Sequence, residues 1–152
     1  MSELRLRRRI LGIDLGKARV GVAVSDELGM LAHPLETIPG GADVVGRIAA
    51  IVAEKNVERV VVGLPRHMNG SVGTGGSEAL AFAGKLQARA GCVVTTWDER
   101  MTTIAATRAL RESGRKARNS RGVVDQVAAQ MILQSYLDAL SDGGGPGSDP
   151  VG

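Results

Sequence analysis

The stretch from Ile10 to Asp26, ILGIDLGKARVGVAVSD, constrains the fold of this chain more than any other. It predicts a strand over Ile10–Leu15, a four-residue turn over Gly16–Arg19 and a returning strand, which together make a β-hairpin. The first strand is nearly all apolar, as in central strands that are covered on both faces. It nevertheless contains a carboxylate, Asp14. Burying a lone carboxylate costs roughly several kcal/mol unless a cation or hydrogen bonds compensate it. Asp14 is therefore expected to be a functional group at the sheet surface or else a serious defect.

The 152 residues suffice for one ordinary domain, and 43% of them are apolar, which is enough for a real core. No apolar run approaches about 18 residues, so no transmembrane helix is expected. The single cysteine, Cys92, cannot form an internal disulfide, and a cytoplasmic location is expected for such a chain. We interpret Cys92 as a small buried residue that opens a strand.

The remaining chain predicts an alternation of strands and helices. Residues 1–8 resemble a basic arm, 9–140 the folded domain, and 141–152 a disordered Gly/Pro tail. After the hairpin we expect strands over Met30–Ile38, Arg59–Leu64 and Cys92–Asp98, and helices over Ala42–Asn56, Ser77–Ala90, Thr103–Ser113 and Val123–Leu140. Three antiparallel strands followed by two βα crossovers predict an α/β fold, a mixed five-stranded sheet with helices on both faces.

Two finer expectations concern these helices. Ser77 is the predicted N-cap of the second helix. The last helix is expected to bury one apolar stripe formed by Val124, Val127, Ala128, Met131 and Ile132. The isolated aromatic residues Trp97 and Tyr136 are interpreted as core residues rather than as platforms for stacking bases.

Three acidic residues stand where predicted elements begin or end. Asp14 lies on the first strand, Glu99 follows the last strand, and Asp125 lies in the first turn of the last helix. If the first and last strands are parallel neighbours of one sheet, these acids meet at its carboxyl end, where α/β sheets place their sites. Converging carboxylates repel one another unless a cation intervenes, and such oxygen ligands suit Mg²⁺ or Mn²⁺ rather than zinc. The alternative is that Glu99 and Asp125 are surface acids in salt bridges.

Basic residues concentrate between Arg100 and Arg121, a segment that contains seven basic residues and one acidic residue. Such a block in a nearly neutral domain points to a polyanionic partner such as nucleic acid, although a solvated face would look the same. Together with an acidic metal site, it is typical of a nuclease. The predicted nucleic-acid-binding residues are Lys17, Arg19, Arg66, Arg100, Lys116, Arg118 and Arg121.

Their expected roles differ. Lys17 and Arg19 would hold a phosphate beside Asp14, or are plain turn charges. Arg66 opens a glycine-rich loop that either binds an anion or is simply mobile. Arg100 would neutralise the scissile phosphate or orient the adjacent acid, and the last three basic residues would grip the backbone without reading sequence.

Four blocks in order resemble the YqgF (RuvX) family: DLGKARVGVAVSD from Asp14, VGLPRHMNGS from Val62, DERMTT from Asp98 and VDQVAA from Val124. The resemblance covers about residues 10–140. It implies a ribonuclease H-like fold with sheet order 3-2-1-4-5, and it maps the family's acidic triad onto Asp14, Glu99 and Asp125. The family's proteins are described as Holliday junction resolvases and as nucleases that mature the 5′ end of pre-16S ribosomal RNA. Asn69 and Arg121 depart mildly from its pattern.

The leading hypothesis is therefore a divalent-metal endonuclease acting on junction DNA or on precursor ribosomal RNA. A resolvase must make two symmetric nicks, so that activity predicts a homodimer, whereas end-processing of RNA does not require one. The alternative is a non-catalytic nucleic-acid-binding factor of the same fold. A sugar-kinase or actin-like ATPase also opens with an Asp-x-Gly turn, but it needs two such domains, for which this chain is too short.

Overall fold

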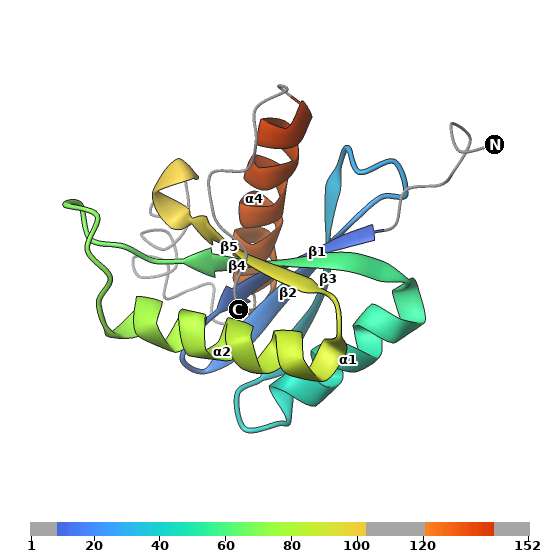
Figure 1. Cartoon of the computed structure of the whole chain (residues 1–152), viewed down its shortest axis with the longest axis horizontal. Helices are drawn as coiled ribbons and strands as arrows, with labels where there is room; N and C mark the ends of the chain where they lie inside the picture. The colour runs from blue at the N-terminus through green and yellow to red at the C-terminus, as the bar shows by residue number, and fades with distance from the viewer. Residues whose placement is uncertain (1–8, 103–120, 142–152) are drawn as a thin grey trace.

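The computed structural model describes residues 9–102 and 121–141, without the side chains of 121–125. Figure 1 shows a single sheet with helices on both of its faces. The strands are β1 (Arg9–Leu15), β2 (Arg19–Ser25), β3 (Ala32–Pro39), β4 (Val57–Leu64) and β5 (Val93–Asp98). The helices are α1 (Val44–Lys55), α2 (Thr74–Ala90), the short 3₁₀ helix η2 (Glu99–Met101) and α4 (Arg121–Ser141). The predicted helix over Thr103–Ser113 lies outside the described residues.

The sheet has the predicted order, β3-β2-β1-β4-β5. The predicted hairpin is present, because β1 and β2 pair antiparallel around the turn closed by the Gly16 N–H donating to the Arg19 carbonyl at 3.0 Å. β2 and β3 are also antiparallel, while β1, β4 and β5 run parallel to one another. β3 lies at the edge, as its Pro34 predicts, since proline cannot donate to a ladder.

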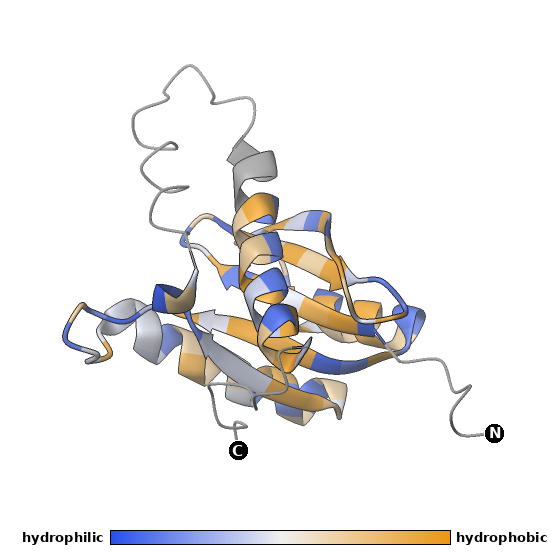
Figure 2. Ribbon diagram, turned by 90° about the horizontal axis from the view of Figure 1, so that it is seen from above, coloured by the Kyte–Doolittle hydropathy of each residue, from blue (hydrophilic) through white to orange (hydrophobic). Residues whose placement is uncertain are grey.

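Alternation along β1 assigns its side chains to two layers. Leu11 and Ile13 are fully buried in the layer that also contains the inner faces of α1 and α2. Ile10 belongs to the opposite layer, which is covered by α4, and alternation places Asp14 on that same face. Figure 2 shows α4 crossing the mostly apolar strands, with hydrophilic residues in the turns. No helix in the described part of the chain is long and apolar enough to cross a membrane.

The start of α2 differs from the prediction. The helix begins at Thr74 after an extended Gly73, and Ser77 lies inside it, its N–H donating to the Gly73 carbonyl at 2.9 Å. Ser77 is therefore not the N-cap. Glycine-rich sequence indicated a loop here, but Gly76 is buried in the helix, and a Cβ on it would lie 2.8 Å from the Pro65 carbonyl oxygen. Close packing on the preceding loop overrides the weak helix propensity of glycine.

The buried stripe of α4 is also displaced from the prediction. It consists of Ala128, Ala129, Ile132, Leu133, Tyr136 and Leu137. Val127 and Met131 are only half-buried, because the helix turns its other edge toward the sheet. The core assignment of the aromatic residues is confirmed, since Trp97 and Tyr136 are 2% and 1% exposed and pack edge to face with ring centroids 5.5 Å apart.

Two glycines let α4 approach the sheet closely. A Cβ on Gly12 of β1 would lie 2.6 Å from Leu133 Cβ and 2.9 Å from the Ala129 carbonyl oxygen. A Cβ on Gly63 of β4 would collide with the Ile132 side chain. Larger residues at either position would push the helix away from the strands that carry the acids.

Gly12→Ala should therefore lower the free energy of unfolding by about 1–3 kcal/mol, because the helix backbone cannot yield without repacking. Gly84→Ala is the matched control: it lies in α2 with no atom within 4 Å of an added Cβ. It should raise stability by roughly 0.5–1 kcal/mol. Urea unfolding of both variants measures the difference, and an equal effect of the two substitutions would contradict the close packing of α4.

Candidate active site

Asp14 is the buried carboxylate around which the site is built. It is the penultimate residue of β1 and is only 1% exposed. Both neighbouring strands present a glycine beside it: Gly21 is its partner on β2, and Gly63 on β4 follows the paired residues Ile13 and Val62. The missing side chain of Gly63 leaves room over β4 that Ile132 of α4 and Glu99 occupy.

Glu99 reaches the same space from β5. It is the first residue of η2, directly after Asp98, and it is half-buried. Its Oε2 would lie 2.9 Å from a Cβ on Gly63, so its carboxylate occupies the room that this glycine leaves. Adjacent strands are about 4.8 Å apart, and β4 separates β1 from β5, so the Glu99 carboxylate reaches back from the end of β5 over β4. Glu99 thus lies over Gly63, the β4 residue that neighbours Asp14.

The third acid, Asp125, lies in α4, and its side chain is not among those described. The following residue shows where this part of the helix sits. Gln126 Nε2 donates to Thr37 Oγ1 at 3.0 Å, and Thr37 pairs with Gly21, the partner of Asp14. The α4 backbone around Asp125 therefore crosses the sheet at the level of Asp14.

The described donors fit a hard divalent cation. Among the residues whose side chains are described, no three Asp, Glu, His or Cys cluster closely enough to hold a metal. Asp14 and Glu99 both carry carboxylate oxygens, and such oxygens are the ligands that Mg²⁺ or Mn²⁺ prefers.

Arg66, Asp98 and Arg100 form a second cluster at the same end of the sheet. Arg100 Nη2 donates to Asp98 Oδ2 at 2.7 Å, and its Nε lies 3.1 Å from both carboxylate oxygens. Arg66 Nε lies 3.6 Å from Asp98 Oδ2. The hydrogen bonds from Arg100, with a further contribution from the charge of Arg66, hold the pKa of Asp98 below its ordinary value. Two arginines on one carboxylate leave the cluster positively charged.

This cluster changes the interpretation of Arg100. The sequence suggested that Arg100 neutralises a phosphate or orients Glu99, and the structure adds that its guanidinium is anchored on Asp98, a residue that sequence analysis did not single out. The available signal was the Asp-x-Arg spacing of Asp98 and Arg100, which lets an aspartate accept hydrogen bonds from both the backbone and the side chain two residues later.

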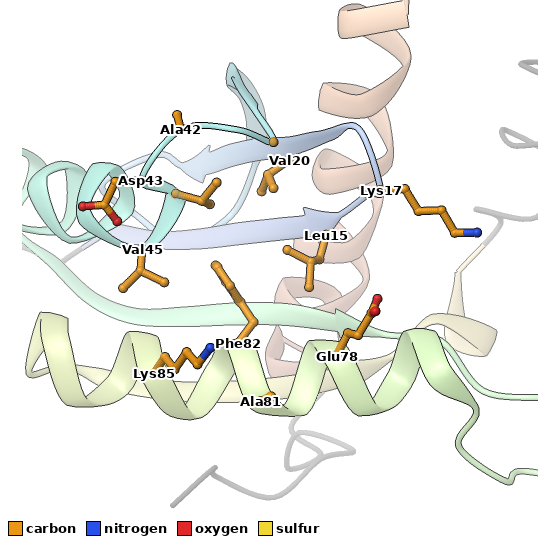
Figure 3. Close-up of a pocket in the computed structure, with 13 residues that line it drawn as sticks. Leu15, Lys17, Val20, Ala42, Asp43, Val45, Glu78, Ala81, Phe82 and Lys85 are labelled. Atoms are coloured by element: carbon orange, nitrogen blue, oxygen red, sulfur yellow. The ribbon is translucent and has the colours of Figure 1, made fainter.

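The other predicted basic residues are placed as follows. Lys17 is exposed in the β1–β2 turn, and Arg19 opens β2. Lys17 lines a pocket of about 420 Å³ together with Leu15, Val20 and Phe82, and Figure 3 shows its side chain extending outward from the edge of this pocket. That pocket lies on the α1–α2 side of β1, opposite the face of Asp14. Arg121 begins α4, and Lys116 and Arg118 lie outside the described residues.

A mixed five-stranded sheet of this order, with helices on both faces, is the architecture of the ribonuclease H-like class. The chain matches the model of the family described as "RuvX: Holliday junction resolvase" over residues 8–139, and it belongs to that family. A relative from Acetivibrio thermocellus is 47% identical, with 86% of this chain and 96% of the relative covered. A relative from Moorella thermoacetica is 48% identical, with 90% and 99% covered. Both carry the name "Putative pre-16S rRNA nuclease".

Solved structures support the fold. RuvC of T. thermophilus in complex with a Holliday junction substrate matches with a TM-score of 0.56 and 19% identity, covering 92% of this chain and 99% of that chain. The Fowlpox virus resolvase in complex with Holliday junction DNA matches with a TM-score of 0.53 and 11% identity, covering 87% and 98%. The ribonuclease H-like fold and the family implied by the sequence motifs are confirmed.

Asp98→Asn should make stability less dependent on acidic pH. Because the pKa of Asp98 is lowered from its ordinary value of 3.8, its ion pairs stabilise the fold above that value. This stabilisation is lost as the pH falls through the lowered pKa. The difference in unfolding free energy between wild type and variant should therefore be constant near neutral pH and shrink at pH below about 4. Urea unfolding across that range measures it.

Arg100→Gln is the matched variant for this experiment. It removes the main cause of the lowered pKa while leaving the carboxylate in place, so its own acid sensitivity should fall between those of wild type and Asp98→Asn. A difference that is the same at every pH would show that Asp98 contributes nothing through its charge.

Proposed function

We propose that this protein is a divalent-metal-dependent endonuclease that hydrolyses phosphodiester bonds in structured nucleic acid. The observation that carries the proposal is the position of the Glu99 carboxylate over Gly63, the β4 neighbour of Asp14, which is itself only 1% exposed. We infer that Asp125 completes the catalytic and metal-binding set. Its neighbour in α4, Gln126, donates a hydrogen bond to Thr37, at the level of the sheet where Asp14 lies.

The residues of the site have different proposed roles, which follow from their chemistry. Asp14 and Glu99 would hold Mg²⁺ or Mn²⁺, which supplies activation of water and neutralisation of charge on the leaving oxygen. The Arg66–Asp98–Arg100 cluster attracts a phosphate backbone to the same end of the sheet, because its charge is not fully balanced. Lys17, in the turn that follows Asp14, is free of any hydrogen bond or ion pair with the described residues and extends toward solvent, where it can contact a second phosphate.

Two substrates follow from what the chain resembles. The named relatives support an RNA precursor, specifically the 5′ end of pre-16S ribosomal RNA. The family description and the likeness to resolvases support four-way junction DNA, which would also require a homodimer for symmetric nicking. Side-by-side cleavage of a four-way DNA junction and a pre-16S RNA fragment by one preparation tests the two, and analytical ultracentrifugation tests the dimer.

Asp14→Asn and Glu99→Gln should each abolish cleavage of whichever substrate the wild type cuts, while affinity for that substrate remains within about threefold. Each variant removes a ligand charge but keeps the shape of the side chain. Glu78→Gln is the matched control, because Glu78 is exposed on α2 at the opposite face, and it should cleave at the wild-type rate. Wild-type cleavage by both site variants would refute the assignment of the acids.

Metal binding can also be measured without any substrate. In metal-free buffer Asp14→Asn should leave thermal stability unchanged or raise it, since it removes a buried charge beside another carboxylate. Saturating Mn²⁺ at about 100 times its dissociation constant should stabilise wild type by about 2.7 kcal/mol, and should stabilise the variant far less. A large loss of stability in metal-free buffer would instead show that Asp14 is a structural residue. Differential scanning calorimetry with and without Mn²⁺ distinguishes these outcomes.

A further inference from the structure

Met68 is the most exposed large apolar side chain in the described part of the chain, at 94% exposure. It lies at the tip of the loop 65–73 between β4 and α2, which Figure 1 shows projecting past the end of β4. Met101, which directly follows Arg100 in η2, is 62% exposed. Met68 and Met101 thus present apolar side chains to water close in sequence to Arg66 and Arg100.

The loop that carries Met68 is built to hold it in place. The His67 N–H donates to the Ser71 carbonyl at 2.9 Å, and the Gly70 N–H donates back to the His67 carbonyl at 2.8 Å. Asn69 Oδ1 accepts hydrogen bonds from the Ser71 backbone and hydroxyl at 2.9 and 2.7 Å. Gly70 has a φ of +89°, which closes the turn and which other residues rarely adopt.

Two arginines fasten this loop to the end of the sheet. Arg66 Nη1 donates to the Gly70 carbonyl at 2.8 Å, and Arg100 Nη1 donates to the Met68 carbonyl at 3.3 Å. Both arginines also contact Asp98, the residue before Glu99. The Met68 backbone is thus tied through Arg100 to the strand end that supplies the Glu99 carboxylate, so that a substrate at Asp14 and Glu99 passes close to the loop.

We propose that Met68 contacts nucleobases at an open or unstacked step of the substrate, while Arg66 and Arg100 lie against the flanking phosphates. Methionine is among the apolar residues that insert between base steps, and a preorganised loop lowers the entropic cost of doing so. The charges at the base of the loop favour a polyanion over an apolar protein surface. This inference rests on the proposed nuclease function and extends it to the kind of nucleic acid that is recognised: a branched or bulged structure rather than a continuous duplex.

The test uses the full chain with Ca²⁺ in place of Mg²⁺, so that binding is measured without cleavage. The probes are a four-way DNA junction and a bulged RNA duplex, each with 2-aminopurine at the branch or bulge, and the corresponding continuous duplexes. Wild type should raise the fluorescence of at least one of the branched or bulged probes by unstacking the labelled base. Met68→Ser should weaken binding of that probe about tenfold and remove the fluorescence rise, with duplex affinity changed less than about twofold.

Two variants control for general effects. Met68→Leu keeps an apolar side chain and should retain both affinity and fluorescence. Leu28→Ser alters a residue that is 60% exposed in the β2–β3 turn, at the opposite end of the sheet, and should behave as wild type. The probe on which Met68→Ser has its effect, DNA or RNA, identifies which substrate supplies the open step.

The outcomes separate this inference from the function on which it rests. If wild type cleaves in Mg²⁺ while Met68→Ser keeps full affinity and fluorescence on both probes, the nuclease assignment stands and the role of Met68 is refuted. Met68 would then serve a protein contact. If wild type neither binds nor cleaves any of the probes, the proposed function fails and the inference fails with it.

Discussion

The close approach of α4 to β1 and β4 is the contact on which the rest of this structure depends. Gly12 and Gly63 make it possible, since a Cβ on either would strike the helix. The helix then lies low enough for Gln126 to reach Thr37, which places its beginning at the level of Asp14. The same missing side chain at Gly63 leaves the room that the Glu99 carboxylate fills. One packing constraint therefore sets both the core on this face and the position of the Glu99 carboxylate over β4.

The position of Asp14 is costly for a domain of this size. Its neighbours on β1, Ile13 and Leu11, are fully buried, and an apolar residue at position 14 would extend that core without desolvating a charge. Local rules that are broken at one position of an otherwise consistent strand usually mark function. The cost is understandable if a cation is bound there.

Local patterns predicted most of the fold. The hairpin and the edge position of β3 follow from turn chemistry and from the proline within β3. The errors arose where tertiary contacts decide. Gly76 joins α2 because it packs on Pro65, and α4 rotates its buried edge to meet two glycines on distant strands. Neither contact can be predicted from the sequence immediately around the residues whose positions it determines.

The candidate site shows the same division between local and distant information. The acids stood out in the sequence because a charge in an apolar run or at a strand end is a local anomaly. A count of positive charges could not reveal how the arginines are used, because Arg66, in the loop after β4, and Arg100 meet at Asp98 on β5. Bound in this way, they act less as free cations than as supports that fix the loop 65–73 and position its charge. The positive sign of the electrostatic field at this end of the sheet follows from the composition of the chain. The positions of the charges that produce this field follow from the parallel pairing of β4 with β5.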